Sequence, residues 1–202
     1  MKPGPRYRVT ASNVDAHLFE VKLMIPAPVA GQVVSMPVWI PGSYLVREFA
    51  RHLMRLSAMQ GGQGIATEQL SKAEWRLDCR PGHPVEVIYE VYAFDTSVRA
   101  AFLDRHRGFF NGTSLLLRVH GQEACAHSLE LAEPARSRRW QVACPLSAVK
   151  VNERGFGEYL AGNYDELVDA PVEYGAFWSE TFRVGGAVHR LVVAGATPAF
   201  DG

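Results

Sequence analysis

The stretch HLFEVKLMI, residues 17–25, indicates the fold class most directly. Its apolar and more polar positions alternate, so that one set comprises Phe19, Val21, Leu23 and Ile25. A period of two places such a set on one face of a β-strand, whereas a helix repeats every 3.6 residues. The stretch therefore predicts a strand with one buried face.

Six further segments repeat this alternation, and Gly, Pro, Asn or Asp cluster between most of them. They are KAEWRLDC (72–79), VEVIYEVYAF (85–94), TSLLLRVHG (113–121), SLELAE (128–133), RWQVAC (139–144) and WSETFRVGGAVHRLVVAG (178–195). The last predicts a hairpin, because Val184 and Val188 flank a Gly185-Gly186 turn. Eight or more short strands with few helices predict an all-β fold, an antiparallel β-sandwich with one or two short helical turns.

The first helical turn is expected within MPVWIPGSYLVREFARHL, residues 36–53. Here we predict a strand that ends at Trp39-Ile40 and then a Pro41-Gly42 turn. Ser43 would cap a helical turn that buries Leu45 and Phe49, which are spaced at i and i+4. A new strand would begin at about His52. The mixture of polar and aromatic side chains suggests an active site, but this interpretation makes the stretch primarily a scaffold.

The second helical turn is expected in NYDELV, residues 163–168, where Asn163 would be the N-cap. Nearby carboxylates suggest an alternative, a cation site or an acid/base pair. They are Asp165, Glu166, Asp169 and Glu173. Helix capping and termination explain them better, because acidic residues stabilise a helix N-terminus and the proline at 171 ends the helix. The loop arginines Arg136, Arg138 and Arg139 suggest a phosphate site, but solvated side chains are the preferred interpretation.

Composition excludes several classes of protein. The 202 residues are 48% hydrophobic and 21% charged, which suits one domain or a tightly joined pair. Lys plus Arg and Asp plus Glu number 21 each, so no basic excess indicates a nucleic-acid or membrane-surface partner. No apolar run is long enough for a membrane span, and no signal peptide is visible, so we expect a cytoplasmic protein.

Familiar catalytic motifs are missing from the sequence. No histidine is followed by glutamate, so the HExxH motif of zinc peptidases is not present. The G-x-S-x-G elbow and the P-loop are missing too, and the three cysteines are too scattered for a zinc site. We therefore expect no catalytic residue, no metal ligand and no cofactor in this chain.

The segment DRHRGFFNGTSLLL, residues 104–117, is the strongest binding candidate. Two phenylalanines precede Asn111-Gly112, a pair that readily adopts positive φ, and a strand is predicted to follow. The segment is expected to start a hairpin or form a bulge that exposes backbone groups at a sheet edge. Edges of this kind often line sites.

Three segments together resemble one known family: MPVWIPGSYLVREFARHL, FFNGTSLLL, and NYDELVDAPVEYGAF followed by VHRLVVAG. They are similar to the N-terminal domain of the glycyl aminopeptidase family, zinc metallopeptidases with a C-terminal PDZ domain. The resemblance spans about residues 7–195. It implies an N-terminal β-sandwich domain at residues 1–197, with residues 198–202 beginning a linker to an absent catalytic domain.

The resemblance also implies partners and a role. The partners would be a zinc-peptidase domain bearing HExxH and a PDZ domain of the same polypeptide, acting on peptides with a small N-terminal residue. By analogy with the wider aminopeptidase clan, the β domain would cover the cleft and help to recognise the substrate amine. Phe110, Asn111 and Gly112 would contribute, through the Asn111 side chain and nearby carbonyls.

Two alternatives stay open. A free-standing β-sandwich would bind peptide or carbohydrate through exposed aromatic residues such as Trp39, Trp140 or Trp178, although each also suits core packing. An independent hydrolase built from unaligned Cys, His and Asp residues is the less favoured alternative.

Overall fold

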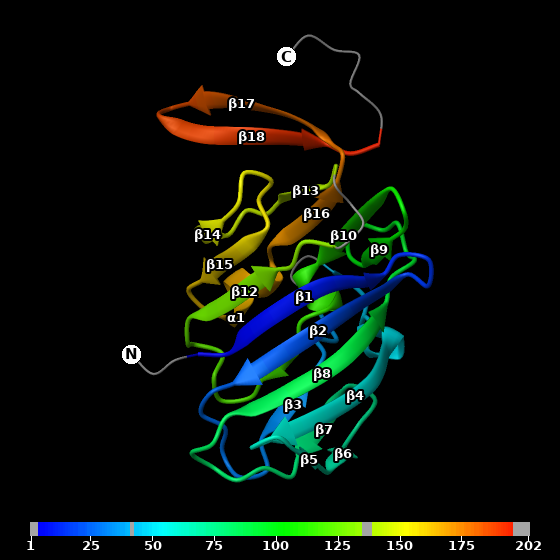
Figure 1. Cartoon of the computed structure of the whole chain (residues 1–202), viewed down its shortest axis with the longest axis vertical. Coiled ribbons are helices and arrows are strands. Elements are labelled where there is room, and N and C mark those ends of the chain that lie inside the picture. Colours follow the sequence, from blue (N-terminus) through cyan, green and yellow to red (C-terminus); the bar gives the residue numbers. More distant parts are fainter. Residues whose placement is uncertain (1–3, 41–42, 135–138, 196–202) are drawn as a thin grey trace.

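The computed structural model describes residues 4–40, 43–134 and 139–195 (Figure 1). Three sequence-based predictions therefore lie outside the described residues. They are the Pro41-Gly42 turn, the placement of Arg136 and Arg138, and the domain boundary at residues 197 and 198.

One large sheet organises the fold. Its eight strands follow the order β14-β15-β12-β1-β2-β8-β4-β5. The bounds are β1 Arg6–Asn13, β2 Leu18–Ile25, β4 Leu53–Gln60, β5 Gln63–Ile65, β8 Val85–Tyr92, β12 His127–Leu131, β14 Ser147–Val151 and β15 Gly157–Ala161. The stretch 17–25 forms β2 as predicted, and its four alternating apolar side chains are buried. The neighbouring pairs are antiparallel except for β1 and β12, which run parallel.

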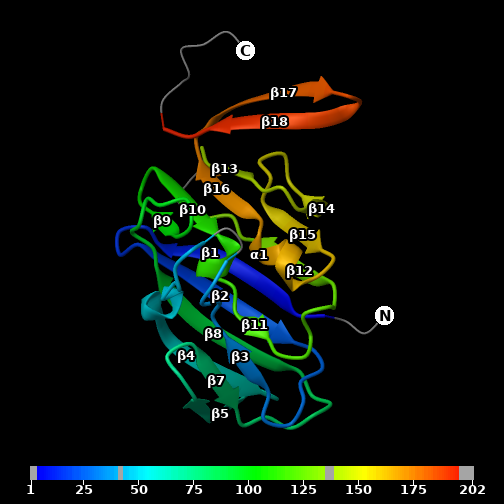
Figure 2. The same cartoon turned by 180° about the vertical axis from the view of Figure 1, so that it is seen from behind.

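Two four-stranded sheets complete the body. The first has the order β13-β16-β10-β9 and the second β11-β3-β7-β6. Their bounds are β3 Val33–Ser35, β6 Thr67–Gln69, β7 Glu74–Leu77, β9 Ala101–Leu103, β10 Arg107–Asn111, β11 Arg118–Val119, β13 Gln141–Ala143 and β16 Pro171–Gly175. Seen from behind, β3, β7 and β11 lie in front of the large sheet (Figure 2).

A single hydrophobic core joins these layers. Phe19 of β2 meets Phe110 of β10 edge-on, with ring centroids 5.7 Å apart, and Tyr174 of β16 at 6.0 Å. Val34 of β3 and Leu77 of β7 are fully buried in the same core. The predicted all-β sandwich is thus confirmed.

Short helical turns occur where chain segments cross between sheets. They are η1 (Phe49–His52), η2 (Gly112–Ser114) and α1 (Tyr164–Val168). The prediction for α1 is confirmed, because the Asn163 side chain accepts a hydrogen bond of 2.8 Å from the Glu166 N–H. The turn η2 was not foreseen.

The segment 36–48 departs from prediction. The preceding strand ends at Ser35, not at Trp39-Ile40, and helical structure begins only at Phe49. Ser43 does not cap η1; its Oγ instead accepts hydrogen bonds from the Leu45 N–H and the Arg47 Nε–H. The loop closes on itself through an Arg47 N–H to Val38 carbonyl bond of 2.7 Å. This local closure replaces a helix, so Leu45 is 64% exposed while Phe49 is buried.

The leucines 115–117 also depart from prediction, because they form no strand although all three are fully buried. Each leucine carbonyl instead accepts a hydrogen bond from a buried tyrosine hydroxyl. The pairs are Tyr89 to Leu115 at 2.6 Å, Tyr164 to Leu116 at 2.7 Å and Tyr7 to Leu117 at 2.7 Å. Buried carbonyls need partners, and here side chains supply what a neighbouring strand would otherwise provide. We call this the tyrosine-bound segment.

The C-terminal hairpin is confirmed. Strand β17 (Trp178–Val184) pairs with β18 (Ala187–Val193) across Gly185 and Gly186, whose φ angles are 55° and 84°. Positive φ at both turn residues suits glycine and matches the twist of a two-residue hairpin. The hairpin stands apart from the sandwich (Figures 1 and 2), and nearly all of its residues are exposed.

Candidate functional site

A groove of about 1100 Å³ brings together segments that are distant in the sequence. Its walls come from the loop after β3, the start of β7, the turn η2, and α1 with its cap. The three segments that carry the family resemblance each contribute to it. Residues that line the groove from these segments include Trp39, Asn111, Thr113, Asp165 and Asp169.

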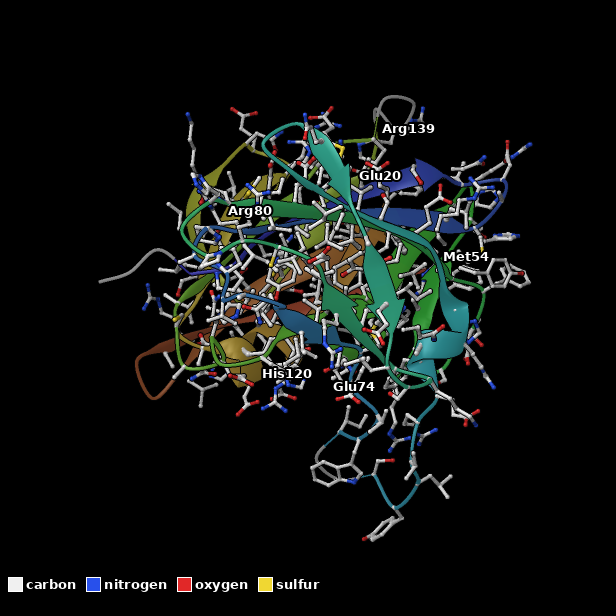
Figure 3. The ribbon with its side chains drawn as sticks, turned by 90° about the horizontal axis from the view of Figure 1, so that it is seen from below. Glu20, Met54, Glu74, Arg80, His120 and Arg139 are labelled. Carbon is white, nitrogen blue, oxygen red and sulfur yellow. The ribbon has the colours of Figure 1, made fainter. Side chains whose placement is uncertain are left out.

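Exposed apolar side chains mark the loop on one side of the groove. Trp39 is 56% exposed and Tyr44 is completely exposed. Val38, Leu45 and Val46 of the same loop are exposed as well. Residues 36–40 and 43–48 project from the body on the side where His120 and Glu74 lie (Figure 3). Monomeric proteins seldom leave such a set of apolar side chains in water, so this loop has the composition of a contact surface.

The opposite wall is acidic. Asp165, Glu166 and Asp169 are exposed on and just after α1. Glu166 also accepts a hydrogen bond of 2.7 Å from the Gly162 N–H, so it closes the capped turn. The helix-capping interpretation is therefore correct for Glu166, while Asp165 and Asp169 give the groove negative charge. Within the described ranges, no three His, Cys, Asp or Glu side chains are arranged to hold a metal ion.

Glu173 does not join these carboxylates. It lies on β16 and forms two hydrogen bonds with the Arg107 guanidinium, at 3.0 and 2.9 Å. Burial raises the pKa of Glu173, and the Arg107 partner opposes that rise. The side chain thus belongs to a structural ion pair inside the four-stranded sheet.

Two polar residues of the groove were not selected from the sequence. The His120 Nε2 shares a hydrogen bond of 2.8 Å with Ser35 Oγ. Arg118 forms an ion pair of 2.6 Å with Glu123. Isolated residues of these types carry no local signal, because only the pairing of β11 with β3 brings His120 beside Ser35.

The three proposed substrate-binding residues have different environments. Phe110 is fully buried in the core, and a Cβ on Gly112 would lie 2.7 Å from the Val168 Cα. These two residues therefore pack β10 against the core and against the end of α1. Asn111 lines the groove, where its Oδ1 accepts hydrogen bonds from the Thr113 hydroxyl at 2.6 Å and the Thr113 N–H at 3.3 Å.

Two details of that prediction are wrong. β10 lies between β16 and β9, so it is an inner strand and not a sheet edge. Neither Asn111 nor Gly112 adopts positive φ, because Asn111 stays extended at −88° and η2 begins directly after it. The pair stops a strand and starts a 3₁₀ turn.

The tryptophans and cysteines do not assemble into one site. Trp140 is buried in the core, Trp39 lines the groove and Trp178 begins β17. Cys79 is buried, and burial raises the pKa of the Cys144 thiol to about 11. A reactive cysteine needs a lowered pKa, so Cys144 does not have the properties of a nucleophile.

Comparison with known proteins gives the family. Residues 6–176 match the peptidase M61 N-terminal domain. The chain belongs to this family. A crystal structure of an aminopeptidase N family protein from Idiomarina loihiensis is 40% identical, with a TM-score of 0.91 over 95% of this chain and 32% of that protein. The chain thus spans about a third of that relative's length. No curated protein sequence matches the chain.

More distant structures share the fold alone. A mutant of an M1 zinc metallopeptidase from Deinococcus radiodurans is 12% identical, with a TM-score of 0.52 over 96% of this chain and 48% of that one. Legionella pneumophila aminopeptidase A is 8% identical, with a TM-score of 0.51 over 89% of this chain and 22% of that one. The sandwich is therefore the N-terminal domain fold of metallopeptidase-like proteins. Among the described helices, none has the length and apolar character needed to cross a membrane.

Proposed function

We propose that the chain is the non-catalytic N-terminal domain of a zinc metalloaminopeptidase and that its groove faces the substrate cleft. The catalytic zinc and its HExxH motif would lie in another domain of the same polypeptide, and a PDZ domain would follow. The bound zinc would activate water for peptide hydrolysis at small N-terminal residues, glycine above all. This chain would contribute shape and charge around that chemistry.

The convergence of the three family-bearing segments on one groove is the observation that supports this proposal most strongly. A domain with only a structural role has no need to gather an apolar loop, an asparagine turn and an acidic helix around one hollow. The apolar loop 36–48 suits contact with a neighbouring domain, because five of its large side chains are exposed. The groove beside it would then lie at the domain boundary, where ligand sites often occur.

The acidic wall suits a substrate with a free amino terminus. An ammonium group has only donors, so it needs carbonyl, amide or carboxylate oxygens as partners. Asp165 and Asp169 supply negative charge, and the Asn111 side-chain oxygen lines the same groove. We therefore propose that Asn111, through its hydrogen bonds to Thr113, holds the turn beside the acidic wall in place. The carboxylates of that wall would attract the substrate amine.

A free-standing module that binds peptide or carbohydrate is the second candidate. The exposed indole of Trp39 favours it, because its ring beside a groove provides a surface for stacking. Its Nε1–H already donates to the Ser43 carbonyl at 2.9 Å, which holds the ring in a fixed position. This candidate predicts ligand binding by the 202-residue chain alone.

The test compares the 202-residue chain with the whole product of the gene that contains it. We expect the whole product to hydrolyse glycyl-p-nitroanilide to glycine and p-nitroaniline in a zinc-dependent reaction, and the 202-residue chain to be inactive. Hydrolysis by the 202-residue chain alone, or no hydrolysis by the whole product, would contradict the proposal. Calorimetry of the 202-residue chain with tetraglycine and with cellotetraose tests the binding module.

The amine role has its own matched variants. In the whole product, Asn111→Ala and Asp169→Asn are expected to raise KM for glycyl substrates severalfold. Asn152→Ala is the control, because its Oδ1, like that of Asn111, accepts two local hydrogen bonds, here from the Arg154 and Phe156 N–H groups, but it lies outside the groove. Equal effects of Asn111→Ala and Asn152→Ala would show that the first acts through folding alone and would remove Asn111 from the proposal.

A further inference from the structure

The hairpin β17–β18 has two faces of different chemistry, and the pairing register assigns its residues to them. Residues directly opposite each other share a face, as do alternate residues along one strand. The register pairs Phe182 with His189 and Glu180 with Leu191. One face therefore carries the apolar residues Trp178, Phe182, Val184, Ala187, Leu191 and Val193. Glu180 and His189 lie on this same face. The other face carries Ser179, Thr181, Arg183 and Arg190, together with Val188 and Val192.

Side-chain contacts agree with this assignment. The rings of Phe182 and His189 stack on the apolar face, with centroids 5.4 Å apart and planes 13° apart. On the opposite face, the Arg190 guanidinium donates to Ser179 Oγ at 3.2 Å. The hairpin is thus amphipathic in the way of a sheet that covers a core.

In the described part of the chain, the central and turn-end residues of the apolar face remain largely exposed. Phe182 is 48% exposed, Val184 58% and Leu191 41%. Among the described strands, β17 and β18 pair only with each other. A two-stranded hairpin is at best marginally stable in water unless a third element packs against it. The pattern of residues 178–193 therefore requires a partner outside the sandwich.

The extent of the family match indicates which partner this is. The match to the N-terminal domain ends at residue 176, two residues before β17 begins. The Idiomarina relative aligns with 95% of this chain, and this alignment takes up only 32% of the relative. The hairpin thus lies outside the matched N-terminal unit, and about two thirds of the relative's length lies outside the alignment.

We propose that the apolar face of β17–β18 packs onto the domain that follows the sandwich in the same polypeptide, so that the hairpin completes the core of that domain. The identity of that domain as a metallopeptidase rests on the proposed function. The apolar hairpin face would then be a joint between the two units. On its polar face, Arg183 would remain in solvent and Arg190 would keep its contact with the Phe177 ring, whose centroid lies 5.4 Å away.

Amide hydrogen exchange over residues 178–193 tests this directly. In the 202-residue chain these amides are expected to exchange rapidly, because the exposed hairpin opens at little cost. In the whole gene product the same amides are expected to exchange at least about tenfold more slowly. Equal rates in the two proteins, or a reading frame that stops shortly after residue 202, would overturn the proposal.

Matched variants identify the face. In the whole product, Phe182→Ser is expected to restore rapid exchange, whereas Arg183→Ser, at the next position on the opposite face, is expected to leave the protection in place. Equal effects of the two variants would overturn the proposal. Protection that appears in the 202-residue chain as its concentration rises would assign the face to a second copy and would likewise overturn it.

These results test the packing of the hairpin separately from the proposed peptidase function. A whole product with a protected hairpin but no zinc-dependent hydrolysis would keep the joint and contradict the proposed function. Zinc-dependent hydrolysis together with an unprotected hairpin would support the proposed function and contradict the packing of the hairpin onto the next domain.

Discussion

The strand pairs β1–β2 and β17–β18 are both antiparallel and both place most of their apolar residues on one face, yet their surroundings differ. In β2 the side chains of Phe19, Val21 and Leu23 are fully buried between the layers of the sandwich. In β17 the equivalent alternating residues, Phe182 and Val184, are about half exposed. The difference shows that an alternation of apolar residues indicates a strand and the face it prefers to bury. Whether that face is buried depends on a second sheet that packs against it.

The turns of the two pairs differ in the same sense. β17–β18 uses two glycines at positive φ. The connection of β1 to β2 places His17 at a φ of 58°, an unusual angle for a residue with a side chain. His17 is held there by a 2.6 Å hydrogen bond to the Leu103 carbonyl and by ring contact with Phe94, at a centroid distance of 4.1 Å. Tertiary contacts can therefore fix a turn that a free hairpin must obtain from glycine.

The largest contrast is expected between two phenylalanines. Phe19→Ala removes a fully buried ring that meets Phe110 and Tyr174, so it should lower the free energy of unfolding by about 3–5 kcal/mol. Phe182→Ala in the 202-residue chain should change it by less than about 0.5 kcal/mol, because the side chain is about half exposed and lies outside the core of the sandwich. Urea unfolding followed by tryptophan fluorescence measures both. Similar losses would show that the hairpin is integrated into the body.

A smaller contrast is expected between two tyrosine hydroxyls. Tyr89→Phe leaves the Leu115 carbonyl buried without its donor and should cost about 1–3 kcal/mol. Tyr44→Phe is the control, because that side chain is completely exposed and should have no measurable effect. Burial raises the pKa of Tyr89, so its hydroxyl remains a donor and the cost should not vary between about pH 6 and pH 9. If the two variants are equally stable, the hydrogen bond from Tyr89 to the tyrosine-bound segment contributes nothing measurable to the free energy of unfolding.

Two histidines extend the comparison to pH. His127 is fully buried on β12, stacks on Tyr7 at 6.0 Å, and its pKa is lowered chiefly by burial. A lowered folded-state pKa stabilises the fold above the ordinary value of about 6.5, and this contribution is lost as pH falls. We expect stability to decline below about pH 6.5, by no more than about 1.4 kcal/mol per pH unit for this one proton.

The variants His127→Gln and His189→Gln separate buried from exposed imidazoles. Urea unfolding at about pH 7.5 and about pH 5.5 should show a smaller pH dependence for His127→Gln than for the unchanged sequence. The same comparison with His189→Gln controls for the replacement of an imidazole outside the sandwich. His189 is the control because it stacks on Phe182 in the exposed hairpin. A pH dependence that survives in His127→Gln would assign it to other groups.

The smallest effect is expected in the hairpin turn. Gly185→Asn keeps a residue that tolerates positive φ and should change hairpin stability by no more than about 0.5 kcal/mol. Gly185→Val should open the hairpin, because a β-branched residue is strained at this φ. Exchange of the 178–193 amides measures both, while urea unfolding of the body should stay the same. If Gly185→Val also lowers the free energy of unfolding of the sandwich, the hairpin and the sandwich are not independent.

The sequence predicted the parts of this fold that depend on local pattern. The alternation in 17–25, the Asn163 cap and the Gly185-Gly186 turn each follow from neighbouring residues, and each was confirmed. The tyrosine-bound segment could not be predicted, because its carbonyls find partners 26 to 110 residues away. Three consecutive apolar residues suit a strand and a buried crossing equally well.

The candidate site shows the same division. Asn111, Trp39 and the carboxylates of 165 and 169 were noticed separately, but no local pattern placed them around one groove. The edge position of β10 was wrong because strand order depends on pairing with β9 and β16, which the sequence of β10 does not reveal. The apolar spacing in 45–53 predicted a helical turn from Ser43 onward, but a loop closed by Arg47 and Val38 formed first and the turn is limited to Phe49–His52.

The tyrosine-bound segment has a consequence for the order of synthesis. Its three hydroxyl donors come from β1, β8 and α1, near the beginning, the middle and the end of the sandwich. Translation delivers Tyr7 first and Tyr164 last, so the Leu116 carbonyl lacks its partner until α1 has left the ribosome. Contacts of such separation also slow folding. A nascent chain stalled before residue 164 should therefore remain sensitive to protease, and the sandwich should close as one unit only when its last segment emerges.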